Sequence, residues 1–337
     1  MVVNYYKDVP VPKPKDHEIL IKVHYSGVCH SDLHAWKGDW PAPTTLPLIG
    51  GHEGIGQVVA LGKDVTDFQI GDFAGIKWLN HACMDCETCN NNLEQLCDKQ
   101  TTSGYSTNGT FRQYATVDFR QAAHIPKDAN HAELSPILCG GLTSYSGIKN
   151  LNLKPGQWIT IVGAGGGLGS LGLQYAKQAF KLKVLGIDQG DKFDFVKSLG
   201  ADAYIDYTKE SNVAEKVKEI TNGGSHGVLN VSGSQTAINQ SFIYARKMGK
   251  VALIAVPPNE NGTFTYSIAA AIAKQLTITG SCVGNRENTQ EALDYVLQGK
   301  VKSPIKIASL KDIPEIFKLL EEGRIKGRYV VDLTKLD

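Results

Sequence analysis

The sequence has almost no net charge and no long apolar run. Among its 337 residues, 35 Lys and Arg stand against 34 Asp and Glu, which leaves a formal net charge of +1. A chain this balanced has no overall electrostatic field to hold nucleic acid or an anionic membrane. No apolar run approaches the ~18 residues that a membrane-spanning helix needs. We therefore expect a soluble globular protein that takes neither nucleic acid nor membrane as a partner.

The first residues also do not have the pattern of a secretory signal, and the number of cysteines is odd. The first residues, Met1 to Asp8, lack the charged-then-apolar pattern of a signal peptide. The cysteines number seven, an odd count. A disulfide framework suits short secreted chains rather than a chain long enough for about two domains. We expect reduced thiols and a cytoplasmic location.

The first third of the chain has the pattern of a β-rich domain. Apolar and polar residues alternate over residues 17–25, as they do in a half-buried strand. Glycine-rich turns follow between residues 50 and 75.

From residue 158 onward, strands alternate with helices. This pattern predicts a parallel sheet covered on both faces, and hence a Rossmann-type nucleotide-binding domain over residues 141–281. The remaining C-terminal segment is too short for a third domain. We therefore predict an α/β protein whose first domain combines residues 1–140 and 282–337. The predicted strands are 158–162, 183–188, 203–206, 227–231, 249–254 and 276–280, and predicted helices cover 171–179 and 193–199.

A glycine cluster lies between the strand at 158–162 and the helix after it. Such a turn binds a pyrophosphate, because small residues allow close backbone approach and the helix N-terminus attracts an anion. The strict G-x-G-x-x-G pattern does not fit if it begins at Gly163, next to the strand, because Leu168 then takes the place of its last glycine. It fits if it begins at Gly167, but that is late after the strand, so the whole cluster is interpreted as the turn. An ordinary strand-to-helix turn is the alternative. The cluster consists of Gly163, Ala164, Gly165, Gly166, Gly167, Leu168 and Gly169.

An acidic residue at the end of the next strand favours dinucleotide binding. Asp188 follows Gly169 by 19 residues, near the ~20 expected of the acid that binds the ribose. A carboxylate there accepts a hydrogen bond from the 2′-hydroxyl and repels a 2′-phosphate. We therefore predict NAD rather than NADP as the cofactor.

Four cysteines follow one another closely with intervening spacings of two, two and seven residues. Four thiolates on one loop form a closed tetrahedral shell for zinc, with no position open for chemistry. In iron–sulfur clusters of similar spacing the fourth cysteine comes about three residues on and precedes proline, whereas here it precedes Asp98. Acidic residues within the loop disfavour a nucleic-acid zinc site, and a chance group of thiols is a further alternative. We predict a structural zinc ion bound by Cys83, Cys86, Cys89 and Cys97.

Three dispersed residues, Cys29, His52 and Cys139, are candidates for a second zinc site. Two thiolates and one imidazole leave the fourth position of zinc for water or substrate, as in catalytic sites. Taken singly, each is more readily explained as a buried structural residue. Their spacing does not show that they meet.

Segments spread along nearly the whole chain resemble the zinc-dependent medium-chain alcohol dehydrogenases, and among these the yeast-type enzymes. The resemblance implies a GroES-like catalytic domain beside the Rossmann domain, and a homotetramer. It also implies reversible hydride transfer between a primary or secondary alcohol and NAD, giving an aldehyde or a ketone. The matching segments are YSGVCHSDLHAW (25–36), GIKWLN (75–80), QYAT (113–116), VGNR (283–286) and GRYVVD (327–332).

The same resemblance implies roles for individual residues. Cys29, His52 and Cys139 would hold a catalytic zinc ion in addition to the structural one. The other implied roles are as follows: Glu53 behind the metal and able to replace water as a ligand, Asp32 orienting the His52 imidazole, Ser31 at the substrate oxygen, His34 at the outer end of a proton relay through the cofactor ribose, and Trp40 and Trp78 as pocket walls. Beyond the glycine cluster and Asp188, cofactor contacts are implied for His30, Lys192, Ser232, Ile254, Val256, Ser281, Val283 and Arg328.

Two positions depart from the fermentative relatives. Ser31 stands where these often have threonine, and Val256 where they carry methionine. Both changes should enlarge the pocket, so bulkier or secondary alcohols are expected as substrates, with a graded preference. The alternatives are a catalytically silent zinc-binding scaffold of the same fold and a related polyol or formaldehyde dehydrogenase.

Overall fold

The structure is a computed structural model that describes residues 3–258 and 262–335. The chain forms two compact units. The first consists of the chain up to Gly140, Gly284–Leu297 and the chain from Ser303 onward. The second consists of Gly141–Val283 and the short segment Gln298–Lys302.

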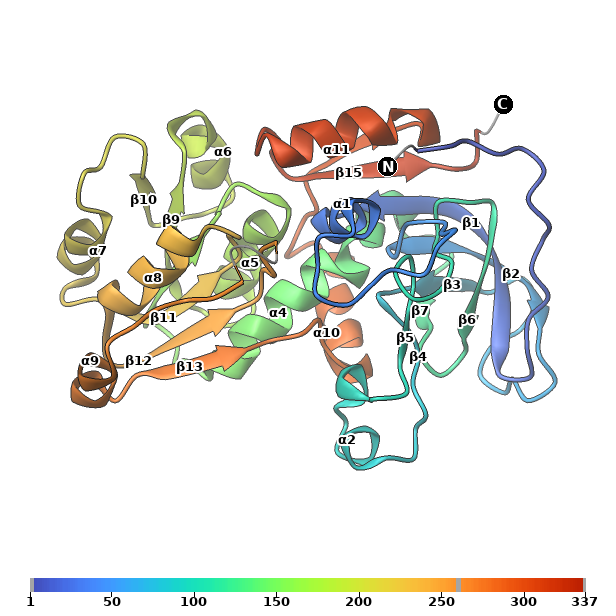
Figure 1. Ribbon diagram of the computed structural model, residues 1–337, viewed down its shortest axis with the longest axis horizontal. Coiled ribbons are helices and arrows are strands. Elements are labelled where there is room, and N and C mark those ends of the chain that lie inside the picture. Colours follow the sequence, from blue (N-terminus) through green and yellow to red (C-terminus); the bar gives the residue numbers. More distant parts are fainter. Residues whose placement is uncertain (1–2, 259–261, 336–337) are drawn as a thin grey trace. The chain divides into compact units, whose positions relative to one another are not determined.

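A seven-stranded sheet forms the frame of the first unit (Figure 1). Its longest strand, β1 (Glu18–Val28), confirms the strand predicted at 17–25 and runs on to Val28. The strands pair in the order β14-β15-β1-β2-β3-β7, with β6 also on β1, and β14 with β15 is the one parallel pair of this sheet within the described residues. The other strands are β2 (Gly54–Leu61), β3 (Phe73–Ile76), β6 (Tyr114–Asp118), β7 (Ala123–Ile125), β14 (Ile305–Ala308) and β15 (Arg328–Asp332).

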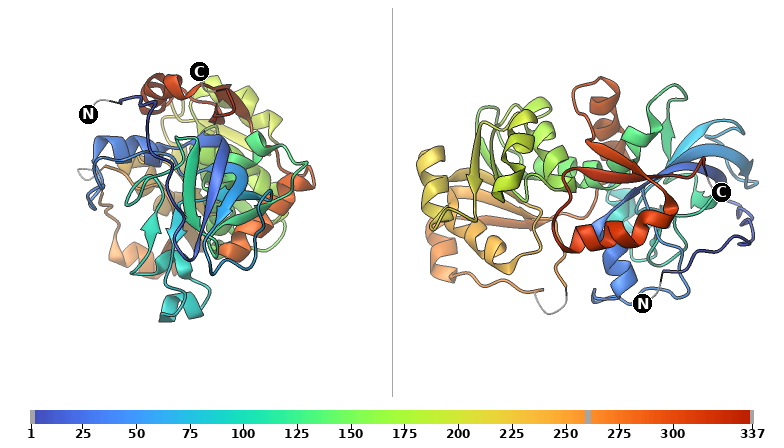
Figure 2. Two further views of the ribbon diagram at one scale, coloured as in Figure 1. Left: turned by 90° about the vertical axis from the view of Figure 1, so that its right-hand side faces the viewer. Right: turned by 90° about the horizontal axis from the view of Figure 1, so that it is seen from above.

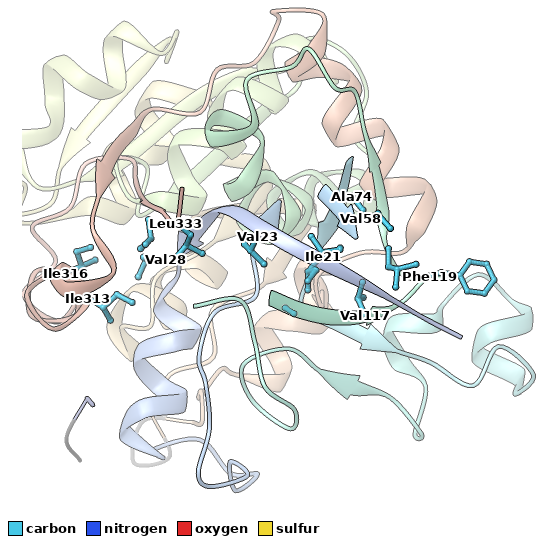
Figure 3. Packing of buried hydrophobic residues seen from close by; sticks show 14 of the residues in the cluster. Ile21, Val23, Val28, Val58, Ala74, Val117, Phe119, Ile313, Ile316 and Leu333 are labelled. Carbon is cyan, nitrogen blue, oxygen red and sulfur yellow. The ribbon is translucent and has the colours of Figure 1, made fainter. Parts of the chain in front are cut away.

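The core of the first unit joins this sheet to helix α11 (Ile313–Glu321). Ile313, Ile316 and Phe317 recur at helical spacing and are buried on one face of α11. Figure 3 shows Ile313 and Ile316 near Val28 and Leu333. Burying an apolar side chain of this size contributes about 1.5–3 kcal/mol. The remaining elements of this unit are α1 (His30–Lys37), β4 (Leu79–His81), α2 (Glu87–Asn90), η1 (Glu94–Leu96), β5 (Thr101–Thr102), α3 (His131–Leu134), η2 (Ser135–Leu138), α10 (Arg286–Leu297) and η5 (Leu310–Asp312).

The second unit contains the predicted parallel sheet, whose strand order is β10-β9-β8-β11-β12-β13. The chain enters at β8, winds outward to β10, and returns to the other side of β8 at β11, so the order reverses between β8 and β11. Such a reversal is where doubly wound sheets bind nucleotides. Helices cover both faces of the sheet (Figures 1 and 2). The strands are β8 (Trp158–Val162), β9 (Lys183–Asp188), β10 (Ala203–Asp206), β11 (Ser225–Asn230), β12 (Ala245–Leu253) and β13 (Thr277–Gly280), and the helices are α4 (Gly140–Leu151), α5 (Gly167–Gln178), η3 (Gly190–Lys192), α6 (Phe193–Ser198), α7 (Val213–Thr221), α8 (Gln235–Tyr244) and α9 (Ile268–Lys274).

The outer strand β13 and helix α9 leave apolar side chains in solvent. Ile268 and Ile272 of α9 are 78% and 71% exposed, and Ile278 of β13 is 37% exposed. An exposed apolar edge strand invites pairing with another chain. Among the described helices, none is both long enough and apolar enough to cross a bilayer.

Candidate functional site

Four side chains from distant parts of the sequence meet inside the first unit. Cys29 lies between β1 and α1, His52 and Glu53 precede β2, and Cys139 follows η2. One ligand atom from each of these residues lies within 4.8 Å of the other three. All four side chains are buried. The structure thus brings together the dispersed residues whose meeting could not be read from their spacing.

Asp32 in the first turn of α1 organises this cluster. Its Oδ2 accepts a hydrogen bond from the backbone N–H of Cys29 at 2.8 Å, which caps the helix. Its Oδ1 accepts from the N–H of Gly51 at 3.1 Å and pairs with Nδ1 of His52 at 2.9 Å. Because an ionised carboxylate only accepts, the network assigns the His52 proton to Nδ1 and leaves the Nε2 lone pair available.

The cluster fits a zinc ion. Nε2 of His52 is buried and has no hydrogen-bond partner within residues 3–258 and 262–335. Two sulfurs and one nitrogen form the donor set of a catalytic zinc site with an open fourth position. The hydrogen bond from the Cys139 thiol lowers the pKa of Cys29 well below its usual range, and the Arg328 charge acts in the same direction. A thiolate at Cys29 is the form that binds metal.

Glu53 is held on one side of the cluster by a buried cation. Its Oε1 accepts hydrogen bonds from Nη2 of Arg328 and, at 3.3 Å, from the N–H of Gly140. Its Oε2 has no partner in the described structure, and a Cβ at Gly27 would collide with it. Burial raises the pKa of Glu53 to about 7, while the Arg328 charge opposes this shift. Glu53 can therefore approach a metal with one oxygen while the other stays anchored.

The predicted relay residues Ser31 and His34 lie on α1. Oγ of Ser31 lies 3.8 Å from Sγ of Cys29. His34, three residues along the helix, is 13% exposed and pairs with Asp39. His30, predicted to contact the cofactor, has its ring centroid 5.8 Å from that of His34.

Aromatic rings form a continuous wall beside the cluster. Trp78 meets the ring of His52 edge-on at 5.1 Å between centroids, and Trp40 contacts Trp78 at 6.2 Å. Tyr105 contacts both tryptophans, at 5.7 and 5.6 Å. No sequence pattern points to Tyr105, because a single tyrosine in a loop after β5 carries no spacing signal. Its position after Gly104, which has φ 69°, marks a tight turn and was the one available hint.

The second predicted metal site is also formed. All seven cysteines in the described chain are free thiols. The four sulfurs of Cys83, Cys86, Cys89 and Cys97 lie within 4.8 Å of one another around α2. Four cysteines in one group suit a closed, structural zinc site.

A buried charge network anchors this cysteine loop to α10. Glu94, 1% exposed in its side chain, accepts hydrogen bonds from the backbone N–H and Nε of Arg286, at 2.8 and 3.2 Å. It thereby caps the N-terminus of α10, where a carboxylate is favourable. Lys77 is fully buried nearby, with Nζ 3.5 Å from Oγ1 of Thr289 on α10. Burial lowers the pKa of Lys77 to about 8, against the attraction of Glu94.

In the second unit the glycine cluster forms the turn between β8 and α5. Gly163 has φ 83°, which favours glycine, and α5 begins at Gly167 with Gly166 as its N-cap. A Cβ at Gly169 would collide with the Gly163 carbonyl. Leu168 is in the first turn of the helix, and its carbonyl accepts from Ser144 at 2.9 Å. The glycine-rich turn predicted to bind the pyrophosphate therefore starts at Gly163, although the strict motif begins only at Gly167.

Acidic residues gather where β9 and β10 end. Oδ2 of Asp188 accepts from the N–H of Gly165 at 2.8 Å, and Nζ of Lys192 lies 3.4 Å from Oδ1. Asp206 is the register partner of Asp188 on β10, and its carboxylate lies against Gly190. The predicted ribose-binding acid, Asp188, therefore has a second carboxylate, that of Asp206, on the neighbouring strand.

The other predicted cofactor residues follow neighbouring strands. Ser232 comes after β11, Ile254 and Val256 after β12, and Ser281 and Val283 after β13. The N–H of Ser281 donates to the carbonyl of Leu253 at 3.1 Å. Because these strands are parallel and adjacent, their carboxyl ends lie at one edge of the sheet. The remaining two predicted cofactor residues, His30 and Arg328, belong to the first unit.

Two family models match the chain. The model "Alcohol dehydrogenase GroES-like domain" matches residues 15–127, and the model "Zinc-binding dehydrogenase" matches residues 167–298. Together with the parallel sheet they confirm the predicted α/β fold class, a GroES-like β-rich part with a Rossmann-type part.

Solved structures give the same result. The chain is similar to an alcohol dehydrogenase of Aeropyrum pernix (26% identity, TM-score 0.89, covering 97% of this chain and 95% of that one). It is also similar to CAD of Helicobacter pylori complexed with NADP(H), with 26% identity and a TM-score of 0.86 over 96% of this chain and 93% of that one. A third similar structure is acetophenone reductase of Geotrichum candidum in complex with NAD, with 27% identity and a TM-score of 0.86 over 97% of this chain and 92% of that one. The second of these structures thus holds NADP(H), whereas the third holds NAD.

Proposed function

We propose a specific reaction for this chain, which belongs to the zinc-type medium-chain alcohol dehydrogenases. The reaction is the reversible transfer of hydride between a primary or secondary alcohol and NAD, giving an aldehyde or a ketone. The observation that carries this proposal is the buried group of Cys29, His52 and Cys139 around an Nε2 atom with no hydrogen-bond partner in the described structure. A catalytically silent scaffold has no need for such an open donor set.

Each residue of the site has a role in this reaction. Cys29, His52 and Cys139 would hold a zinc ion, which when bound supplies a Lewis acid that polarises the alcohol oxygen. Asp32 holds the His52 imidazole in the tautomer that can bind. Ser31 would receive the hydroxyl proton at Oγ while it gives up its own hydroxyl proton to the relay, and His34 would release a proton to solvent. Trp40 and Trp78 exclude water beside the reacting group.

NAD is the proposed cofactor. Asp188 at the end of β9 supports this choice, because its charge attracts a ribose hydroxyl and repels a 2′-phosphate. The carboxylate of Asp206 on the next strand adds to the same negative potential. A second zinc ion, at Cys83, Cys86, Cys89 and Cys97, would be structural.

Bulkier or secondary alcohols, and the corresponding ketones, are the proposed substrates. The small side chains of Ser31 and Val256 support this range. The name of the similar acetophenone reductase also supports it, since that name specifies a ketone with an aromatic ring. A change of one methylene shifts discrimination by about 1–3 kcal/mol, so the preference would be graded.

A yeast-type homotetramer in the cytoplasm is the proposed biological form. The exposed apolar residues Ile268, Ile272 and Ile278 along α9 and β13 support contact with another copy of the chain. The unpaired cysteines of the described chain support a reducing compartment. Neither nucleic acid nor membrane is a proposed partner, in keeping with the net charge of +1.

The decisive experiment combines metal analysis with a substrate panel. We expect two zinc ions per chain and NADH formation with several primary and secondary alcohols, with NADP tested in parallel. One zinc ion and no turnover would favour the scaffold, whereas turnover confined to ethanol and acetaldehyde would contradict the enlarged pocket.

A variant pair tests the proton step. Ser31→Ala should lower kcat about 100-fold or more, the lower range for acid–base groups, while both metals stay bound. Ser31→Thr keeps the hydroxyl and should retain activity. An unchanged turnover in Ser31→Ala, with hydride transfer shown to limit the rate, removes Ser31 from the relay.

A further inference from the structure

A second histidine–aspartate pair lies at the other end of α1. Gly38, with φ 65°, ends the helix in the left-handed conformation, and its N–H donates to the His34 carbonyl at 2.8 Å. This turn brings the next residue, Asp39, back beside the last helical turn. Nδ1 of His34 lies 2.7 Å from Oδ1 of Asp39. The two side chains are 13% and 26% exposed, so the contact is partly shielded from water.

The surroundings restrain the imidazole of His34 further. The Trp40 ring stacks on it at 5.0 Å between centroids and 22° between planes. Tyr105, whose ring also contacts Trp40, donates a hydrogen bond from its hydroxyl to the carbonyl of Ala42. The other titratable residues on the helix are His30, whose ring centroid is 5.8 Å away, Asp32 and Lys37. Because Nδ1 of His34 is held by the Asp39 carboxylate, Nε2 is the ring nitrogen left to exchange a proton.

We propose that Asp39 is a positioning residue for proton transfer by His34. Asp39 holds the proton of neutral His34 on Nδ1, so Nε2 is the nitrogen that accepts and releases the travelling proton. Nε2 takes up the proton that leaves the alcohol, Nδ1 keeps its own, and the same Nε2 then gives the proton to water. Asp39 stays a carboxylate throughout and stabilises the imidazolium formed in passing. The inference rests on the proposed function, since it assigns a role within that relay.

The structure uses the same arrangement twice on one short helix. Asp32 of α1 fixes the His52 ring so that its Nε2 faces the metal ligand set. In the second pair the histidine is on α1 and the aspartate follows it. In both pairs a carboxylate binds Nδ1 and leaves Nε2 for the chemistry.

Asp39→Asn tests the role, with Asp64→Asn as a matched control. Asp64 pairs with another histidine of the same unit, His17, at 3.6 Å, where both side chains are largely exposed. In ¹⁵N-histidine-labelled protein we expect the wild-type His34 signals to show the Nδ1–H tautomer, and Asp39→Asn to reduce its fraction. Turnover should fall about 10-fold in Asp39→Asn, part of the 100-fold or more that a general acid–base group contributes. Asp64→Asn should leave both readouts unchanged.

The double variant separates positioning from a structural effect. In a His34→Gln background, Asp39→Asn should cause no further loss, because Asp39 acts only through His34. Full additivity, or an unchanged His34 tautomer in Asp39→Asn, would overturn the inference. These failures would appear in an enzyme that still oxidises alcohols. Absence of alcohol oxidation in the wild type, by contrast, is a failure of the proposed function.

Discussion

Asp32 binds Nδ1 of His52 with the same carboxylate that caps α1, so the helix start and the imidazole orientation depend on one side chain. The carboxylate is buried, and its oxygens accept from Cys29, Gly51 and His52. A polar group with this many buried partners is costly to remove. The arrangement couples the local fold to the proposed metal site.

Asp32→Ala should weaken metal binding at the cysteine–histidine site. Loss of a carboxylate that orients a ligating histidine typically costs about 10–100-fold in metal affinity. Chelator competition followed by metal analysis should therefore show one zinc ion leaving earlier than in the wild type, and the other unchanged.

The control for this change is Asp16→Ala, since Asp16 is an exposed aspartate paired with Lys63 at the surface. It should release both ions as the wild type does. Equal weakening of both sites in Asp32→Ala would mean a general loss of stability rather than a role for the carboxylate in orientation.

Cys97→Ala should remove the structural zinc ion and loosen its loop. Cys97 is fully buried among the other three sulfurs, whereas Cys282 is exposed and outside both sites. We expect the zinc content to fall from two ions to one, with faster proteolysis within residues 83–97. Cys282→Ala should keep both ions, and retention of two ions in Cys97→Ala would contradict a four-cysteine site.

Lys77→Met should change how stability depends on pH. The pKa of Lys77 is lowered from 10.5 to about 8 in the folded chain because the side chain is buried. Between pH 8 and 10.5 the unfolded state binds more protons than the folded state, so this residue makes stability rise with pH. The rise amounts to about 3 kcal/mol at most, and Lys77→Met should abolish it.

Denaturant unfolding of the wild type and Lys77→Met at pH 7.5, 9 and 10.5 measures this effect. Lys13→Met, at an exposed position, serves as the control and should follow the wild type. Parallel curves for all three proteins would show that Lys77 is charged and well solvated in the folded state.

Asp188→Ala should relax the proposed choice of NAD over NADP. The repulsion between one carboxylate and a nearby phosphate at the protein surface is about 1–4 kcal/mol. Removing it should therefore raise kcat/KM with NADP about 10-fold or more. Selectivity should not invert fully, because Asp206 remains beside the site. The exposed Asp194→Ala serves as the control, and an unchanged ratio of kcat/KM for the two cofactors in Asp188→Ala would remove Asp188 from the discrimination.

Local patterns determined much of the fold and one metal site. The strands predicted at 158–162, 183–188 and 203–206 coincide with β8, β9 and β10, because apolar runs bounded by turns define buried strands. The short spacing of Cys83, Cys86, Cys89 and Cys97 already places all four on one loop, where their sulfurs lie close together. The glycine cluster likewise indicated the turn before α5, although the turn starts at Gly163 and not where the strict motif begins.

Tertiary structure alone decided what meets across long stretches of sequence. The predicted ligands Cys29, His52 and Cys139 converge only because β1, β2 and η2 pack in one unit, and no local spacing encodes that packing. The contact of Glu53 with Arg328 and the contacts of Tyr105 with two tryptophans likewise could not be predicted from sequence patterns. Sequence patterns record interactions between near neighbours, whereas contacts across a hundred residues or more follow from how whole strands and helices bury their apolar faces.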